Sequence, residues 1–213
     1  MAASLIKAGH SVTAWNRSPQ ATAALASQGA SMARTAKEAA GAADFVIAML
    51  RDDEASCQVW LNPEDGALAG IRSSSIAIES STLTPYWVRE LARVMTESNV
   101  AFLEVPVSGA RSQAEAGQLV YHVGGDEATL NRARPVLRAL ALAINHVGPA
   151  GHGALVKLSA NALLGIQSAA LAEIIAMLRE QWHSTGDGIG AVFRARLVIP
   201  PVIRALLNWR SSG

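Results

Sequence analysis

The chain has 213 residues, of which 50% are hydrophobic and 16% charged, and its formal net charge is +1. This composition allows one or two domains with a sizeable core, and it excludes an intrinsically disordered chain and gives no electrostatic support for nucleic-acid binding. The single cysteine, Cys57, excludes an internal disulfide and a multi-cysteine metal site, and the histidine spacing indicates no metal site either.

Helical and strand patterns alternate along the first 147 residues. In chain order we predict a helix over 2–8, a strand over 11–15, a helix over 19–27, a short helix capped by Thr35, a strand over 45–50, a helix from Asp52 toward Trp60, a strand over 75–79, a helix from Thr84 to about Ser98, strands over 101–107 and 119–123, a helix over 126–142 and a strand over 144–147. Glu38, three residues after Thr35, completes a capping-box pattern.

Such alternation is typical of βαβ units, so the predicted fold class is α/β, a doubly wound Rossmann-type parallel sheet with helices on both faces. After Gly148 the pattern changes, because residues 153–179 read as one long alanine-rich helix without strand signals. We therefore predict a first domain over 1–150 and a helical second domain over 151–213. Residues 181–213 are interrupted by glycines and by Pro200-Pro201, and their pattern predicts neither helices nor strands.

Ligands of a doubly wound sheet bind beyond the carboxyl ends of its strands, which directs attention to the loops there. The first such loop carries Asn16, Arg17 and Ser18 where dinucleotide-binding folds often have an acidic residue for the ribose 2′-hydroxyl. A guanidinium can instead hold a 2′-phosphate by paired, charge-assisted hydrogen bonds, which favours NADP over NAD. The alternative is a solvated arginine in a turn.

Two further loops carry hydroxyl groups and glycine. Thr82 lies in the segment 79–85, whose hydroxyls could bind a nicotinamide ribose or carboxamide, or cap the helix that begins at Pro85. In the loop after the predicted strand 101–107, Gly109 would let backbone N–H groups approach an anionic oxygen, and Ser108 adds a donor. An ordinary glycine turn is the alternative there.

Lys157 and Asn161 stand four residues apart in the predicted long helix, so both project from one face of it. A lysine placed among apolar neighbours can serve as a proton-transfer group. Alone, the pair is more often part of a solvated helix face.

Four segments taken together are far more specific, and by them the chain resembles the β-hydroxyacid dehydrogenases, the group of 3-hydroxyisobutyrate dehydrogenase and tartronate semialdehyde reductase, related to 6-phosphogluconate dehydrogenase. They are MAASLIKAGHSVTAWNRSP, ESSTLTP, EVPVSGARSQAEAGQLVYHVGGD and GHGALVKLSANALLG, which occur in the family's order over residues 1–179. The resemblance implies an enzyme that transfers a hydride between NADP, or NAD, and a small 3-hydroxy acid or its semialdehyde or oxo form.

The resemblance also implies roles for particular residues. Lys157 would be the catalytic acid/base and Asn161 would orient the substrate. Ser108, Gly109 and Ala110 would hold the substrate carboxylate. The residues that would contact the cofactor are Asn16, Arg17, Ser18, Leu50 and Thr82.

The chain departs from the family pattern at three places. The family's first strand and Gly-x-Gly-x-x-Gly turn would precede Met1, Ala110 replaces the third residue of the usual Ser-Gly-Gly, and residues 181–213 do not match the family's helical second domain. Two alternatives follow: a non-catalytic remnant of the family that binds little cofactor, and an imine reductase on the same scaffold. Lys157 argues against the second, because imine reductases usually replace this lysine.

The expected partner is a small-molecule hydroxy acid or semialdehyde, with no nucleic acid and no membrane, and the family implies a homo-oligomer. No uninterrupted apolar run reaches the roughly 18 residues of a membrane span, and residues 1–10 lack the features of a secretory signal. We therefore expect a cytoplasmic protein.

Overall fold

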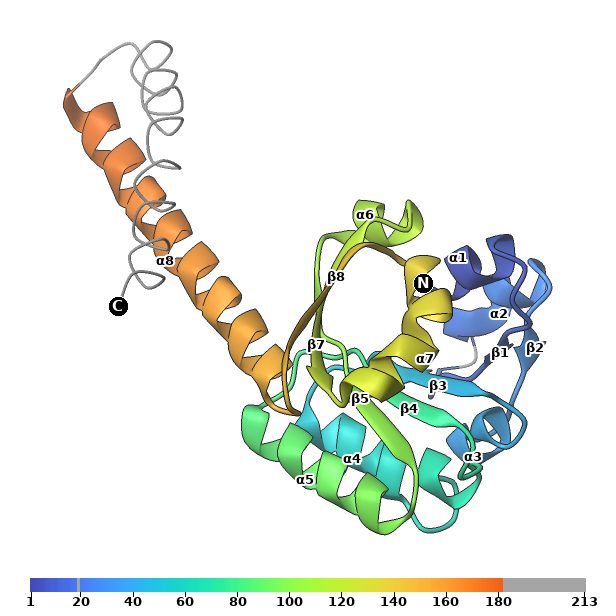
Figure 1. Cartoon of the computed structure of the whole chain (residues 1–213). Coiled ribbons are helices and arrows are strands. Elements are labelled where there is room, and N and C mark those ends of the chain that lie inside the picture. The colour runs from blue at the N-terminus through green and yellow to red at the C-terminus, as the bar shows by residue number, and fades with distance from the viewer. Residues whose placement is uncertain (19, 182–213) are drawn as a thin grey trace. The chain divides into compact units, whose positions relative to one another are not determined.

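The computed structural model describes residues 1–18 and 20–181 (Figure 1). The chain divides into two compact units, Met1–Ala160 and Asn161–Gly213. The division falls ten residues after the domain boundary predicted at 150, because the first turns of the long helix bury Gly153 and Ala154 in the first unit.

A six-stranded sheet forms the centre of the first unit. Its strands are β3 (Phe45–Ala48), β4 (Ile76–Glu79), β5 (Ala101–Glu104), β6 (Val107–Ser108), β7 (Leu119–Gly125) and β8 (Ala141–Gly148). The order is β3-β4-β5-β7-β6, with β8 also paired to β7. The pairs β3–β4, β4–β5 and β7–β8 are parallel, whereas β7 runs antiparallel to β5 and to β6. The predicted α/β class with a mainly parallel sheet is confirmed.

Helices cover both faces of this sheet, as Figure 1 shows for α4 and α5 on one face and α7 on the other. The described helices are α1 (Ala2–Lys7), α2 (Gln20–Ala26), α3 (Ala36–Ala40), α4 (Asp53–Leu61), the 3₁₀ helix η1 (Ala67–Ala69), α5 (Pro85–Glu97), α6 (Arg111–Glu115), α7 (Glu127–Arg138) and α8 (His152–Gln181). Alternating side chains of β4 separate the two cores. Ala77 packs with α4 and α5, whereas Ile76 and Ile78 pack with α7.

Short polar side chains fix where the helices begin. Thr35 accepts a hydrogen bond from the Glu38 N–H at 3.0 Å, which confirms the predicted helix start. Asp52, Thr84 and Asp126 accept equivalent bonds at the starts of α4, α5 and α7. Each cap satisfies an N–H that the first helical turn leaves without a partner.

A separate two-stranded parallel sheet joins β1 (Thr13–Ala14) to β2 (Ser31–Met32). The predicted strand over 11–15 is therefore present but shorter, and β2 was not predicted. Two residues are too short a stretch for period-2 alternation to be visible.

Two further predicted elements are wrong in their extent. The strand predicted over 101–107 is divided into β5 and β6, because Pro106 has no N–H to continue a ladder. The helix predicted to reach Leu142 ends at Arg138, and Ala141 already belongs to β8. The residue pair between them, Ala139 and Leu140, forms the turn; Leu140 is fully buried.

The long helix predicted over 153–179 is confirmed as α8. Its segment His152–Met177 is long and apolar enough to cross a membrane by length and composition, although polar residues interrupt it. One such helix is weak evidence by length and composition alone. Core helices of soluble proteins pass the same test, but they are mostly buried, whereas the apolar window of this helix is 0% buried. The predictions for residue 19 and for residues beyond 181 lie outside the described residues.

Candidate active site

The segment that follows β1 lines a pocket at the carboxyl end of that strand. Its lining residues are Trp15, Asn16, Arg17, Thr22, Ala23, Met32, Ala33 and Arg34. Asn16 shapes the turn, because its Oδ1 accepts a hydrogen bond from the Ser18 N–H at 2.9 Å. The indole Nε1 of Trp15 donates to the Arg34 carbonyl at 3.0 Å, which ties this loop to the segment after β2.

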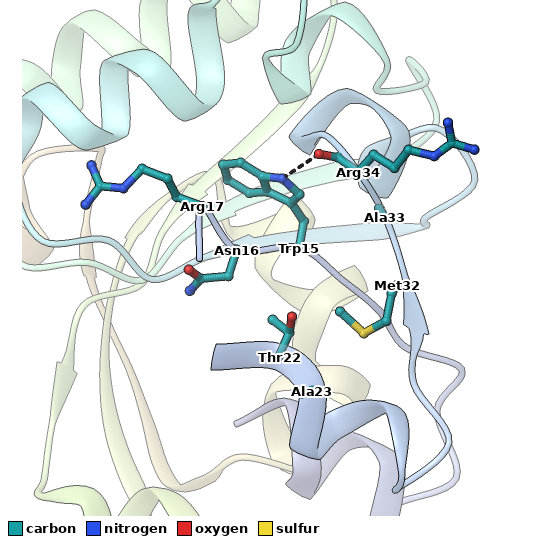
Figure 2. A pocket seen from close by; sticks show the side chains of 8 residues that line it. All are labelled: Trp15, Asn16, Arg17, Thr22, Ala23, Met32, Ala33 and Arg34. Atoms are coloured by element: carbon teal, nitrogen blue, oxygen red, sulfur yellow. Dashed lines mark hydrogen bonds between the residues drawn. The ribbon is translucent and has the colours of Figure 1, made fainter. Parts of the chain in front are cut away.

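Two arginines belong to this pocket, and Figure 2 shows their side chains extending to opposite sides of Trp15. Arg17 is exposed, and its charge is close enough to help lower the pKa of Asp52, after the Ala55 N–H and Arg51. Arg34 was missed in the sequence because it follows the unpredicted strand β2. None of the described lining residues is acidic, so the pocket suits an anionic group.

The ends of β3 and β4 are held by the buried carboxylate of Glu79, which is 1% exposed. Glu79 accepts hydrogen bonds from Ser56 Oγ at 2.7 Å and Trp60 Nε1 at 2.8 Å, and from both the N–H and the hydroxyl of Ser81. The Ser81 hydroxyl in turn accepts from the Leu50 N–H at 2.6 Å. The backbone of Leu50, a predicted cofactor contact, is therefore fixed by a chain of bonds that starts at Glu79.

The hydroxyls of the segment 79–85 divide between two roles. Thr84 caps α5, accepting from the Trp87 N–H at 3.2 Å, and its own N–H and hydroxyl donate to Asp53. The residues bonded to Glu79, which are Ser56, Trp60 and Ser81, form with it what we call the Glu79 cluster. Thr82 lies in the sequence between this cluster and the Thr84 cap and is partly exposed. Capping thus accounts for Thr84, and the role of Thr82 as a ligand contact stays a prediction.

The loop after β6 begins with a glycine that no other residue could replace without strain. Gly109 has φ of +137°, and a Cβ there would lie 3.0 Å from Leu119 Cδ2. The next residue, Ala110, has an ordinary φ of −92°, so its backbone can carry a methyl group where the family pattern Ser-Gly-Gly has its second glycine. The Ala110 N–H donates to Gln113 Oε1 at 2.9 Å and starts α6.

Ser108 has a partner that the sequence did not reveal. Its Oγ lies 2.9 Å from Nε2 of His122, in a hydrogen bond whose direction depends on the imidazole tautomer. The pKa of His122 is lowered by desolvation and, secondly, by the positive charge of Lys157. Ser108, His122 and Lys157, which come from β6, β7 and α8, are therefore neighbours in the first unit.

The start of α8 is attached to the sheet by Glu104, at the end of β5. This buried carboxylate accepts hydrogen bonds from the N–H groups of Gly151, at 2.6 Å, and Ala154. A Cβ on Gly153 would lie 2.5 Å from the His122 carbonyl oxygen, so only glycine allows this approach. We call these contacts of Glu104 and Gly153 with the start of α8 the Glu104 joint. Because Lys157 follows one turn later, the Glu104 joint sets the position of the Lys157 backbone beside β7.

Burial raises the pKa of Glu104, against the opposing effects of the N–H donors of α8 and the charge of Arg89. A carboxyl whose folded-state pKa is raised binds protons more readily in the folded state. We therefore expect its contribution to stability to be greatest below pH 4.5 and to be lost as the pH rises through the folded-state pKa. Urea unfolding of the unchanged chain and of Glu104→Gln across this range should show the difference, and parallel curves would contradict it.

Asn161, the second helical residue of the predicted catalytic pair, is exposed and is the first residue of the second unit. The first unit thus brings together Ser108 and Lys157 through His122, while the residues at the β1 pocket and at the end of β3 belong to separate clusters. The role predicted for Asn161 stays a prediction.

Known proteins that are similar to this chain bind nicotinamide dinucleotides. Residues 1–148 match the family described as the NAD binding domain of 6-phosphogluconate dehydrogenase. The chain is 37% identical over 177 residues to the NAD-dependent L-serine dehydrogenase of Pseudomonas aeruginosa, and 38% identical over 173 residues to a probable 3-hydroxyisobutyrate dehydrogenase of Mycobacterium bovis. These matches cover 83% and 81% of this chain, and 59% and 58% of the relatives. The class is therefore a nicotinamide-dinucleotide-binding protein.

Solved structures agree. The 3-hydroxyisobutyrate dehydrogenase of Mycobacterium tuberculosis with L-serine superimposes with a TM-score of 0.79 at 37% identity, over 84% of this chain and 60% of that one. An imine reductase of Myxococcus stipitatus gives a TM-score of 0.87 over 97% of this chain and 70% of that one, but at 18% identity this likeness shows the fold alone. The chain belongs to the β-hydroxyacid dehydrogenase family, and it spans about three fifths of the length of the relatives it matches.

Proposed function

We propose that the protein is an NADP-linked oxidoreductase that interconverts a small 3-hydroxy acid and its semialdehyde or oxo form. A bound nicotinamide cofactor would supply hydride transfer from the carbinol carbon in oxidation and to the carbonyl carbon in reduction. Lys157 takes the hydroxyl proton in oxidation and returns it in reduction, while Ser108 and the N–H groups around Gly109 hold the carboxylate. Asn161 orients the substrate.

The observation that carries this proposal is the position of Lys157. The Glu104 joint places the start of α8 against β7, and the charge of Lys157 reaches His122, which is hydrogen-bonded to Ser108. This arrangement supports a site in which a proton-transfer group and an anion-binding loop act on one small molecule that carries both a hydroxyl and a carboxylate.

The proposed substrates can be tested with 3-hydroxyisobutyrate and L-serine, the compounds named for the relatives. Both carry a hydroxyl on the carbon next but one to the carboxylate. We expect the purified chain to form NADPH from NADP with at least one of them. Reduction of a cyclic imine without oxidation of either acid would favour the imine reductase alternative. If the chain neither binds cofactor nor turns over either acid, the remnant alternative holds.

NADP is proposed over NAD because Arg17 and Arg34 line the β1 pocket without an acidic neighbour among the described lining residues. Both side chains are exposed, so either can turn toward a phosphate at little cost. We expect Arg17→Glu to weaken NADPH binding at least about tenfold, since a hydrogen bond to a charged group contributes about 1.5–3 kcal/mol. NADH binding should change much less.

Calorimetric titration with both cofactors checks this expectation. Arg138→Glu, a charge reversal on the exposed end of α7, is the matched control and should leave the order of the two affinities unchanged. If Arg17→Glu weakens NADPH and NADH binding equally, or neither, Arg17 is a solvated turn residue.

A further inference from the structure

The histidine beside Ser108 occupies a distinctive position on β7. Alternate residues of this strand, Leu119, Tyr121 and Val123, are buried in the core that α7 covers. His122 lies between them in the alternation and is only partly buried. Its side chain therefore belongs to the opposite face of the sheet, the one that Ser108 and α8 share with it.

The direction of the hydrogen bond between Ser108 and His122 decides what Ser108 can do. If Nε2 carries no proton, the serine hydroxyl must donate to the imidazole, and it then has no proton left for a bound anion. If Nε2 carries a proton, it donates to Ser108 Oγ, and the hydroxyl proton of Ser108 is free to be donated elsewhere. Only the second arrangement makes Ser108 a donor for a carboxylate.

The charged groups near His122 come from two other elements. Lys157 of α8 acts on it directly. Glu104 of β5 lies under the neighbouring Gly124 but is engaged by the N–H groups of α8. The other strands beside β7 place two uncharged residues near His122. They are Ser108 of β6, which is hydrogen-bonded to it, and Asn145 of β8, which is its partner in the register of β7 and β8. In the free protein, the charge that acts on His122 is the positive charge of Lys157. A carboxylate bound beside Ser108 would add a negative charge to this site.

We infer that His122 is a positioning residue for the substrate carboxylate: its Nε2–H donates to Ser108 Oγ and so directs the hydroxyl proton of Ser108 to the carboxylate. This inference rests on the proposed function, because it assigns the anion beside Ser108 to a 3-hydroxy acid. His122 adds to that site a specificity for acids over uncharged hydroxy compounds.

The tautomer can be read directly, without any ligand. Nitrogen NMR of the histidine side chains above the pKa of His122 distinguishes a protonated Nε2 from a protonated Nδ1. We expect Nε2 to carry the proton in the unchanged chain, and the Ser108→Ala variant to shift the Nε2 resonance. A proton on Nδ1, with Nε2 as the acceptor, overturns the inference even if the chain is an active dehydrogenase.

The same spectra test the carboxylate. Titration with 3-hydroxyisobutyrate should raise the pKa of His122, which desolvation and Lys157 hold low in the free protein, because the added negative charge favours imidazolium. The methyl ester of the same compound, which lacks the charge, should leave that pKa unchanged. Binding of the acid without a change at His122 contradicts the inference while leaving the proposed function intact. If the acid does not bind at all, the proposed function fails and the inference with it.

Variants of His122 distinguish a residue that positions Ser108 from one that only supports the fold. We expect His122→Leu to raise KM for 3-hydroxyisobutyrate about five- to tenfold, the loss of about one hydrogen bond, with kcat and NADPH affinity little changed. His122→Gln, whose amide can donate to Ser108, should restore most of the loss. Ser108→Ala combined with His122→Leu should be no worse than Ser108→Ala alone. Additive losses, or no rescue by glutamine, contradict the inference; His10→Leu on an exposed turn is the control.

Discussion

The Lys157→Ala variant should oxidise a 3-hydroxy acid about 10²–10⁴-fold more slowly than the unchanged chain, because proton transfer by a positioned side chain contributes that much to the rate. Cofactor binding should be nearly unchanged, since the β1 pocket and the Glu79 cluster contain no part of α8. Lys157→Arg should not restore turnover, because a guanidinium does not release its proton at working pH.

Initial rates with saturating cofactor, together with calorimetric cofactor affinities, provide the measurement. Lys7→Ala, an exposed lysine in the last turn of α1, is the matched control and should retain full activity. Turnover retained in Lys157→Ala would remove this lysine from the mechanism and would reopen the imine reductase alternative.

The largest loss of stability is expected from Glu79→Leu. The Trp60 Nε1–H and the Ser81 N–H would lose their common acceptor in the core, and each buried donor without a partner costs about 1–3 kcal/mol, so the loss is about 2–6 kcal/mol. That exceeds most single substitutions and is a large fraction of a typical folding free energy.

Denaturant unfolding of the unchanged chain, Glu79→Leu and Glu79→Gln gives the comparison. Glutamine keeps one acceptor oxygen and should cost less than leucine. Glu64→Leu, at an exposed position, should be close to neutral. Unfolding curves for Glu79→Leu that coincide with those of the unchanged chain would show that the cluster contributes nothing to stability.

Patterns local in sequence could be predicted, whereas contacts between distant segments could not. The cap of α3 by Thr35 and the long α8 follow from neighbouring residues alone, and both are present. The two-residue strand β2 forms because it pairs with β1. A strand this short shows no alternation of apolar and polar residues in the sequence from which it could be predicted. Arg34, which follows β2, was missed for the same reason.

The site shows the same division. Ser108 and Lys157 could be named from motifs, but their link through His122 depends on β6 pairing antiparallel with β7 and on the close approach of α8. In the sequence, His122 is only one of five histidines without metal-ligand spacing. A histidine that takes its partner from another strand carries no signal of its own in a single sequence.

The Glu104 joint has a consequence for how such chains can be recombined. Glu104 and Gly153 fix the start of α8, and the chain divides only after Ala160, so Lys157 belongs to the first unit rather than to the second. A chimaera joined after Ala160 would therefore inherit Lys157 and the loop of Ser108, for which we propose proton transfer and anion binding, from one parent and Asn161 onward from the other. Exchange of the second unit at this junction would replace Asn161 and the residues after it while leaving Lys157 in its original surroundings.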